Sequence, residues 1–109
     1  MSILFTVESN QYVKDLVDIL INKQYFSYPD NAKDYVDKLL YYCYNYISVL
    51  PGKKAPDRFK KYGKDLYYIT YRANKQTSWY IFYQHRHDVF VVTYITNNHV
   101  NAHHIRGLR

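Results

Sequence analysis

Three β-favouring segments, residues 66–72, 79–84 and 89–95, follow one another closely in the second half of the chain. They consist largely of β-branched and aromatic residues, the types that fit a pleated surface. The breaks between them, residues 73–78 and 85–88, are polar and short. A parallel crossover needs a dozen or more residues, so the segments predict an antiparallel β-meander. Both alternating sets of side chains are mostly apolar or aromatic, so one face is expected to pack helices and the other to be a covered or binding surface.

The first part of the chain predicts a short strand and a helix. Residues 3–7 favour a strand, and the hydrophobic period then changes. Beginning at Ser9, the expected N-cap, apolar residues recur at steps of three and four until the pattern ends near Asn22. This helix is expected to bury one apolar side, made by Tyr12, Val13, Leu16, Val17 and Leu20.

A second helix is expected between the start signals at residues 29–31 and the stop signal Pro51-Gly52. Its apolar positions form one long stripe, made by Ala32, Tyr35, Val36, Leu39, Leu40, Cys43, Tyr46, Ile47 and Leu50. Together the two helices predict a hairpin packed on the meander, with the first strand added to the sheet. The expected fold is a two-layer α+β sandwich in one domain over residues 1–109.

Composition limits the class of protein. The formal net charge of +6 favours an acidic partner, either nucleic acid or an acidic protein segment. The single cysteine, Cys43, lies in the apolar stripe and is interpreted as a core residue rather than a nucleophile. The N-terminus lacks a signal-peptide pattern, and no apolar run approaches the roughly 20 residues of a membrane helix. We therefore expect a cytoplasmic protein without a membrane partner.

Positive charge is concentrated in the connector between the second helix and the meander. This basic segment is either a phosphate-contacting loop or an ordinary solvated connector. Six candidate nucleic-acid-binding residues lie in this segment, and Arg86 from the second turn of the meander is a seventh. The six are Lys53, Lys54, Arg58, Lys60, Lys61 and Lys64. The 15 tyrosines have two similar interpretations, as base-stacking rings or as amphipathic rings that cap a core.

Histidines gather towards the end of the chain, at His85, His87, His99, His103 and His104. They could form a zinc site, but no cysteine or carboxylate lies at a supporting spacing, so no metal is expected. A catalytic role for His99 is the better hypothesis, because it follows a central strand and histidine as a residue type ordinarily titrates near neutral pH. No glycine-rich phosphate loop or catalytic triad is present, and no cofactor is expected.

The order of a strand, a helical hairpin, a basic segment and a meander resembles the RelE/ParE superfamily of toxin–antitoxin toxins. The likeness covers almost the whole chain, and residues 62–69, 79–84 and 89–95, leading to His99, carry it most strongly. It implies a toxin that either cleaves messenger RNA at the ribosome or poisons DNA gyrase. It also implies a cognate antitoxin that wraps the sheet and helices.

The resemblance has further implications for the site. RNA-cleaving members place cations on the first two meander strands, at positions that correspond here to Tyr68, Thr70 and Tyr80. These side chains cannot neutralise a phosphate. The remaining candidates for catalysis are His99, Arg72 and Tyr94. Three hypotheses stay open: a ribosome-dependent endoribonuclease, a gyrase-inhibiting toxin without catalysis, and a non-toxic nucleic-acid- or protein-binding module of mobile-element origin.

Overall fold

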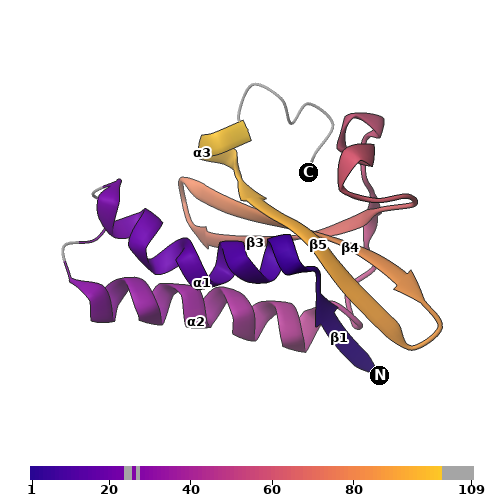
Figure 1. Cartoon of the computed structure of the whole chain (residues 1–109), viewed down its shortest axis with the longest axis horizontal. Helices are drawn as coiled ribbons and strands as arrows, with labels where there is room; N and C mark the ends of the chain where they lie inside the picture. The colour runs from indigo at the N-terminus through magenta and orange to yellow at the C-terminus, as the bar shows by residue number, and fades with distance from the viewer. Residues whose placement is uncertain (24–25, 27, 102–109) are drawn as a thin grey trace.

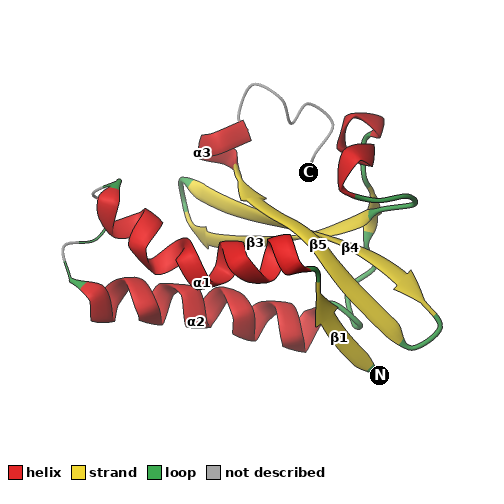
Figure 2. Ribbon diagram, viewed as in Figure 1, coloured by secondary structure: helices red, strands yellow, loops and turns green. Residues whose placement is uncertain are grey.

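A computed structural model of the protein describes residues 1–23, 26 and 28–101. An N-terminal strand leads into two long helices, and the chain then forms the meander (Figures 1 and 2). The elements, in order, are β1 (Ser2–Phe5), α1 (Val7–Asn22), α2 (Pro29–Tyr46), β2 (Lys53–Lys54), the 3-10 helix η1 (Asp57–Tyr62), β3 (Tyr67–Asn74), β4 (Thr77–Arg86), β5 (Val89–Asn97) and α3 (Asn98–Asn101). The predicted α+β class and the order of strand, hairpin and meander are confirmed.

The five strands form one sheet in the order β1-β5-β4-β3-β2. The meander β3-β4-β5 is antiparallel, as predicted, and its strands run longer than predicted because the two turns are tighter. Strand β1 pairs parallel to β5, so the complete sheet is mixed. This pairing covers only residues 89–92 of β5. Beyond Val92, the described part of the chain places no strand on that side of β5.

The helices α1 and α2 lie side by side against one face of the sheet (Figure 1). The predicted stripe of α2 is buried at Ala32, Val36, Leu39, Cys43 and Ile47. On α1, Leu16 and Leu20 are buried, and Tyr12, Val13 and Val17 are half-buried. The interpretation of Cys43 as a core residue is confirmed: its side chain is 1% exposed, and burial raises the pKa of its thiol to about 12.

The predicted helix boundaries need two corrections. Helix α1 begins at Val7, because Thr6 rather than Ser9 is the N-cap: the Thr6 hydroxyl accepts a hydrogen bond from the Ser9 amide. Ser9 lies inside the first turn and is buried, with its hydroxyl donating to the Val92 carbonyl at 2.7 Å. Helix α2 ends at Tyr46, one turn before the predicted Leu50.

The basic segment is ordered rather than an open loop. Lys53 and Lys54 pair with the start of β3, and residues 57–62 form η1 against the face of the sheet opposite α1 and α2. Figure 2 shows this short helix on the far side of the sheet from the long hairpin. Phe59 of η1 is 4% exposed and packs 4.6 Å from Phe82, measured between ring centroids. The prediction that neither face is a plain solvent face is therefore confirmed.

Candidate functional site

The sheet face beneath η1 carries an aromatic cluster, which we call the η1 face. Its buried members are Phe59, Leu66, Tyr68, Tyr80 and Phe82, with Ala55, Tyr62 and Tyr94 packed around them. Tyr68 and Tyr80, two of the three positions that the resemblance matched to cations of RNA-cleaving toxins, are only 1% and 7% exposed. These two positions are therefore closed to a phosphate by burial as well as by residue type.

Cations surround this cluster with their charges in solvent. Arg58, Lys60, Lys61 and Lys64 are all exposed on η1 or directly after it. The Arg58 guanidinium lies 5.1 Å from the centroid of the Phe59 ring, and the Lys61 ammonium lies 5.2 Å from that of Tyr62. Contacts of this kind hold the cations near the rings at little energetic cost. The η1 face thus combines aromatic rings with exposed positive charge.

The other predicted basic residues extend this surface. Lys53 and Lys54 are exposed on β2 at the edge of the sheet. Gln84 of β4 donates a 3.0 Å hydrogen bond to the Lys64 carbonyl, which ties the end of the basic segment to the sheet. Arg86 lies two residues further along β4, on the same side of the strand, and is exposed. The structure therefore places all seven predicted nucleic-acid-binding residues on exposed positions.

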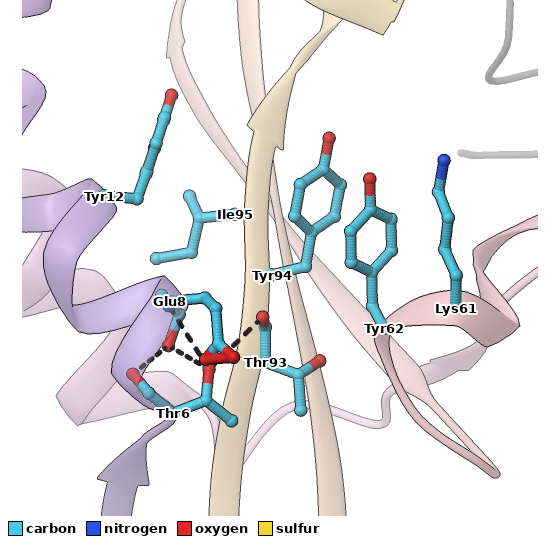
Figure 3. Close-up of a pocket in the computed structure, with 9 residues that line it drawn as sticks. Thr6, Glu8, Tyr12, Lys61, Tyr62, Thr93, Tyr94 and Ile95 are labelled. Carbon is cyan, nitrogen blue, oxygen red and sulfur yellow. Dashed lines mark hydrogen bonds between the residues drawn. The ribbon is translucent and has the colours of Figure 1, made fainter.

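A cavity of about 480 Å³ opens where the start of α1, the middle of β5 and the end of η1 meet. Figure 3 shows Tyr12 and Glu8 entering from α1, Tyr94 and Ile95 from β5, and Tyr62 and Lys61 from η1. Of these residues, only Tyr94 and Lys61 were among the predicted site residues. A volume of this size is typical of small-ligand sites.

Tyr62 and Tyr94 form a parallel stack at the side of this cavity, with ring centroids 3.7 Å apart and planes 3° from parallel. Desolvation, together with a hydrogen bond and charge repulsion from Tyr94, raises the pKa of Tyr62 to about 12. Desolvation, followed by the neighbouring Tyr94 and Tyr35, likewise raises the pKa of Tyr12 to about 12. Both hydroxyls therefore stay protonated at physiological pH and can donate hydrogen bonds.

The floor of the cavity depends on an irregularity in the sheet. The register between β4 and β5 shifts at Phe82 and Tyr83, so that Tyr83 pairs with Val92 and Phe82 with Tyr94. Thr93 is the extra residue of this β-bulge, a feature that redirects side chains locally. Its Oγ1 is buried and has no hydrogen-bond partner among the described residues.

The predicted catalytic residues do not converge. Arg72 pairs with Ser78, whereas Tyr94 pairs with Phe82, so the two lie about four residues, or roughly 13 Å, apart along β4. The Arg72 guanidinium donates a 2.9 Å hydrogen bond to the Lys75 carbonyl and so faces the β3–β4 turn. Arg72 lies two and four residues after Thr70 and Tyr68 in β3, so the three side chains share the η1 face of the sheet.

His99 belongs to the opposite, helix-covered side of the sheet. It lies in α3, whose first turn is held by Asn97: the Asn97 Oδ1 accepts hydrogen bonds from the backbone amides of His99 and Val100. The His99 Nε2 lies 2.9 Å from the Thr77 hydroxyl. His99 and Tyr94 both line a second cavity of about 470 Å³ along α1. The structure therefore places His99 and Arg72 at the same end of the sheet, beside Thr77 and Ser78 of β4, but on opposite faces.

The structure gives little support for a metal site in the part of the chain that it describes. Residues 1–23, 26 and 28–101 contain no group of three or more histidine, cysteine, aspartate or glutamate side chains that could hold a metal ion. His85 is stacked on Phe90, with ring centroids 3.9 Å apart. The histidines at positions 103 and 104 lie outside the described residues.

Tyr12, Glu8 and Thr93 were missed as candidate site residues. Tyr12 has the sequence signal of an ordinary core position, and only the closeness of η1 gives its ring a cavity to face. Thr93 looks like any strand residue until the bulge is known. Tyr62 carried the clearest available signal, because it lies next to Lys61 in a stretch with many cations.

None of the described helices is long and apolar enough to cross a membrane. Comparison with known proteins assigns no relationship: no family model, curated protein or solved structure matches this chain.

Proposed function

We propose that this protein is the toxin component of a type II toxin–antitoxin module of the RelE/ParE kind, and that it inhibits growth by binding a cytoplasmic target, DNA gyrase, without cleaving RNA. The toxin assignment is supported by the resemblance, together with the order of strand, helical hairpin, basic segment and meander. One observation favours the non-cleaving mode. Tyr68 and Tyr80 occupy two of the expected cation positions and are buried under η1.

The chemistry of RNA cleavage supports this choice of mode. Cleavage by the ribose 2′-hydroxyl needs a base, an acid and a cation that stabilises the developing negative charge, all within reach of one phosphate. Here His99 is hydrogen-bonded to Thr77 on the helix side, whereas Arg72 reaches back to the Lys75 carbonyl. A binder needs no such convergence.

The proposed antitoxin would cover a sheet edge and basic surface. Strand β1 is the outer strand of the sheet, carries no charged residue, and exposes 54% of Leu4, with Val7 83% exposed directly after it. An uncharged edge strand presents unpaired backbone N–H and C=O groups, to which a strand of another chain can pair. The formal charge of +6 favours an acidic segment for this role. The partner is expected to be encoded by a neighbouring gene.

A ribosome-dependent endoribonuclease is the second candidate, and His99 favours it. The side chain is exposed, and its ring is oriented by the Thr77 hydroxyl at the end of the last strand. That is where the resemblance implies a functional side chain. In this mechanism His99 would act as a general acid or base.

Inducible expression in a bacterial host tests the proposal. The wild-type chain is expressed alone and with the adjoining gene, and growth, messenger RNA integrity and DNA supercoiling by purified gyrase are measured. We expect growth arrest that the adjoining gene relieves, intact RNA and inhibited supercoiling. Normal growth at high expression would refute both toxin mechanisms and leave the inert binding module.

His99→Ala separates the two toxin mechanisms, with His87→Ala in the exposed β4–β5 turn as the matched control. For a gyrase-type binder, both variants should inhibit growth nearly as well as the wild type. For a nuclease, His99→Ala should lower RNA cleavage by about 10²–10⁴-fold, the usual loss of a general acid or base, while His87→Ala keeps it. RNA cleavage that depends on His99 would therefore overturn the binding mode.

A further inference from the structure

The two outer strands of the sheet differ in how well they are protected from pairing with another strand. Strand β2 has only two residues, and both are exposed lysines, Lys53 and Lys54. Strand β1, at the other edge, has four residues, Ser2–Phe5, and none of them is charged. Natural sheets keep their edges from pairing by means of lysine and other charged residues, proline, or very short strands. Strand β2 is therefore protected by its charge and its length, whereas β1 carries neither charge nor proline.

The backbone of β1 leaves one side of the strand for a further partner. The amides of Ser2 and Thr6 donate hydrogen bonds of 2.8 and 3.0 Å towards β5. Because hydrogen-bonding groups alternate along a strand, Ile3 and Phe5 turn their N–H and C=O groups away from β5. The described part of the chain places no strand on this outer side of β1 (Figure 1). These two residues therefore present backbone donors and acceptors to a strand from outside.

Leu4 lies between these two residues and is left exposed. The side chains of Ile3 and Phe5 pack against the helix-face cluster, so the Leu4 side chain points to the opposite face of the sheet. It is 54% exposed, and Val7, three residues further on, is 83% exposed. The outer edge of β1 thus combines outward backbone groups with uncovered apolar side chains.

We propose that two copies of this chain pair antiparallel through β1, about a twofold axis at Leu4. In this register Ile3 of each copy lies opposite Phe5 of the other, and each such pair exchanges two backbone hydrogen bonds. The two Leu4 residues meet at the axis as a non-hydrogen-bonded pair, the kind whose side chains lie closest together. Because each copy has a single β1 edge, the assembly closes as a dimer with one continuous sheet.

The distribution of charge favours a second copy over an acidic segment as the occupant of this edge. Lys53 and Lys54 on β2 lie four strand spacings, or roughly 19 Å, from β1. Pairing through β1 therefore places the lysine-bearing edges of the two copies at opposite ends of the joined sheet. The charged residues next to β1, which are Glu8, Arg86 and Asp88, are of both signs. An acidic segment would find little net charge to neutralise here, whereas an uncharged strand meets no repulsion from its own copy.

The dimer goes beyond the proposed function and does not depend on it. It has one consequence that does rest on the proposed function, because β1 is also an edge that the antitoxin is expected to cover. A chain paired with its own copy cannot accept another strand at β1. Binding of the antitoxin at this edge therefore requires the dimer to dissociate, and this consequence is tested separately.

Sedimentation of the purified chain over a wide range of concentrations measures the equilibrium. We expect a monomer–dimer equilibrium with a dissociation constant of roughly 1–100 μM, because an interface built on one short strand is at the small end of specific interfaces. Amide hydrogen exchange then locates the contact. The amides of Ile3 and Phe5 should exchange more slowly as the protein concentration rises, whereas the amide of Leu4, which faces β5, should not change.

Two variants test the pairing directly. Leu4→Lys places like charges opposite each other at the axis and should weaken dimerisation by about tenfold or more. Ile3→Pro removes an N–H group that β5 does not use, and it should weaken dimerisation by about 5- to 150-fold through the loss of one hydrogen bond from each copy. The matched control is Val100→Lys in α3, which follows the end of β5 that β1 does not reach. Val100 is 59% exposed, and this variant should dimerise as the wild type does.

A chain that stays monomeric at about 300 μM, or that forms assemblies larger than a dimer, would overturn the proposal. A dimer that either variant leaves unchanged, when circular dichroism shows the variant to be folded, would also overturn it, since the interface would then lie elsewhere. Addition of the purified product of the adjoining gene should convert the dimer into a complex with one copy of this chain. A complex that keeps the β1 dimer would refute the shared edge alone. Growth and supercoiling are measured independently, so failure of the dimer and failure of the toxin proposal are told apart.

Discussion

The two faces of the sheet are covered in different ways. The helix face lies under α1 and α2, which have 16 and 18 residues, whereas the η1 face lies under a single 3-10 helix of six. Among the described residues, three of the 14 buried in the helix-face cluster are aromatic, Trp79, Tyr83 and Phe90, against four of the five in the η1-face cluster. One face of the sheet is thus covered by a thick, mainly aliphatic layer, and the other face by a thin, mainly aromatic layer.

This difference separates stability from binding. Cavities of similar volume border both faces, about 470 Å³ along α1 and about 480 Å³ beside η1. The cavity beside η1 differs in its lining, because the stacked rings of Tyr62 and Tyr94 form one side of it. The exposed cations of η1 lie on the same side. We therefore expect the helix face to contribute most of the stability and the η1 face to be the better candidate for recognition.

The largest effect is expected on the helix face. Leu39 is 1% exposed, so Leu39→Ala should lower the free energy of unfolding by about 2–5 kcal/mol through lost burial and the cavity left behind. Lys38→Ala, at the exposed neighbouring position, should change it by less than about 0.5 kcal/mol. Chemical denaturation measures both values. Similar small losses for the two variants would show that this face does not dominate stability.

A smaller loss is expected from the matching change on the η1 face. Phe59 is 4% exposed and belongs to the six-residue helix η1, and we expect water to enter the space that truncation opens under so short a helix. Phe59→Ala should therefore cost about 1.5–3 kcal/mol, close to the burial term alone. The same denaturation series, with Tyr28→Ala at an exposed position as the control, measures it. A loss above that of Leu39→Ala would reverse the comparison.

The helix face was largely predictable because its signal is periodic. Recurrence at three and four residues marked Leu16 and Leu20 on α1, and Val36, Leu39 and Cys43 on α2, all of which are buried. The early end of α2 and the parallel pairing of β1 were not predicted. Neither leaves a local signal, because tertiary contacts decide helix ends and strand partners.

The candidate site was only partly predictable, for a different reason. The cations of the basic segment could be predicted, because lysine and arginine are concentrated there, and Tyr94 was a candidate on the last strand. The 3-10 helix that joins them is short and follows no long period, so it could not be seen. The β-bulge at Thr93, which brings Tyr94 and Ile95 to the cavity, is a property of pairing between two strands.

A hydrogen bond at the border of the two faces should have a moderate effect. The Ser9 hydroxyl holds the start of α1 on β5 by donating to the Val92 carbonyl. Ser9→Ala should lower the free energy of unfolding by about 0.5–1.5 kcal/mol, because Val92 still accepts the Thr6 amide and is not left unpaired. Ser48→Ala, at an exposed position after α2, is the control. An effect equal to the control would show that the contact contributes nothing to stability.

The smallest effect at neutral pH concerns Tyr12, at the α1 side of the cavity. Desolvation raises its pKa to about 12 in the folded protein, against about 10 in the unfolded chain, so the folded state favours the neutral phenol. This contribution is fully present below pH 10 and is lost as the pH rises from 10 to 12, because the unfolded chain releases its proton first. Tyr12→Phe cannot ionise, and its free energy of unfolding should fall less steeply over that range, by at most about 1.4 kcal/mol per pH unit for one proton. Denaturation at pH 7, 10 and 11.5, with Tyr41→Phe on exposed α2 as the control, measures the slopes. Parallel pH curves for Tyr12→Phe and the wild type would mean that the ring is hydrated and the cavity wet, which would weaken the contrast between the two faces.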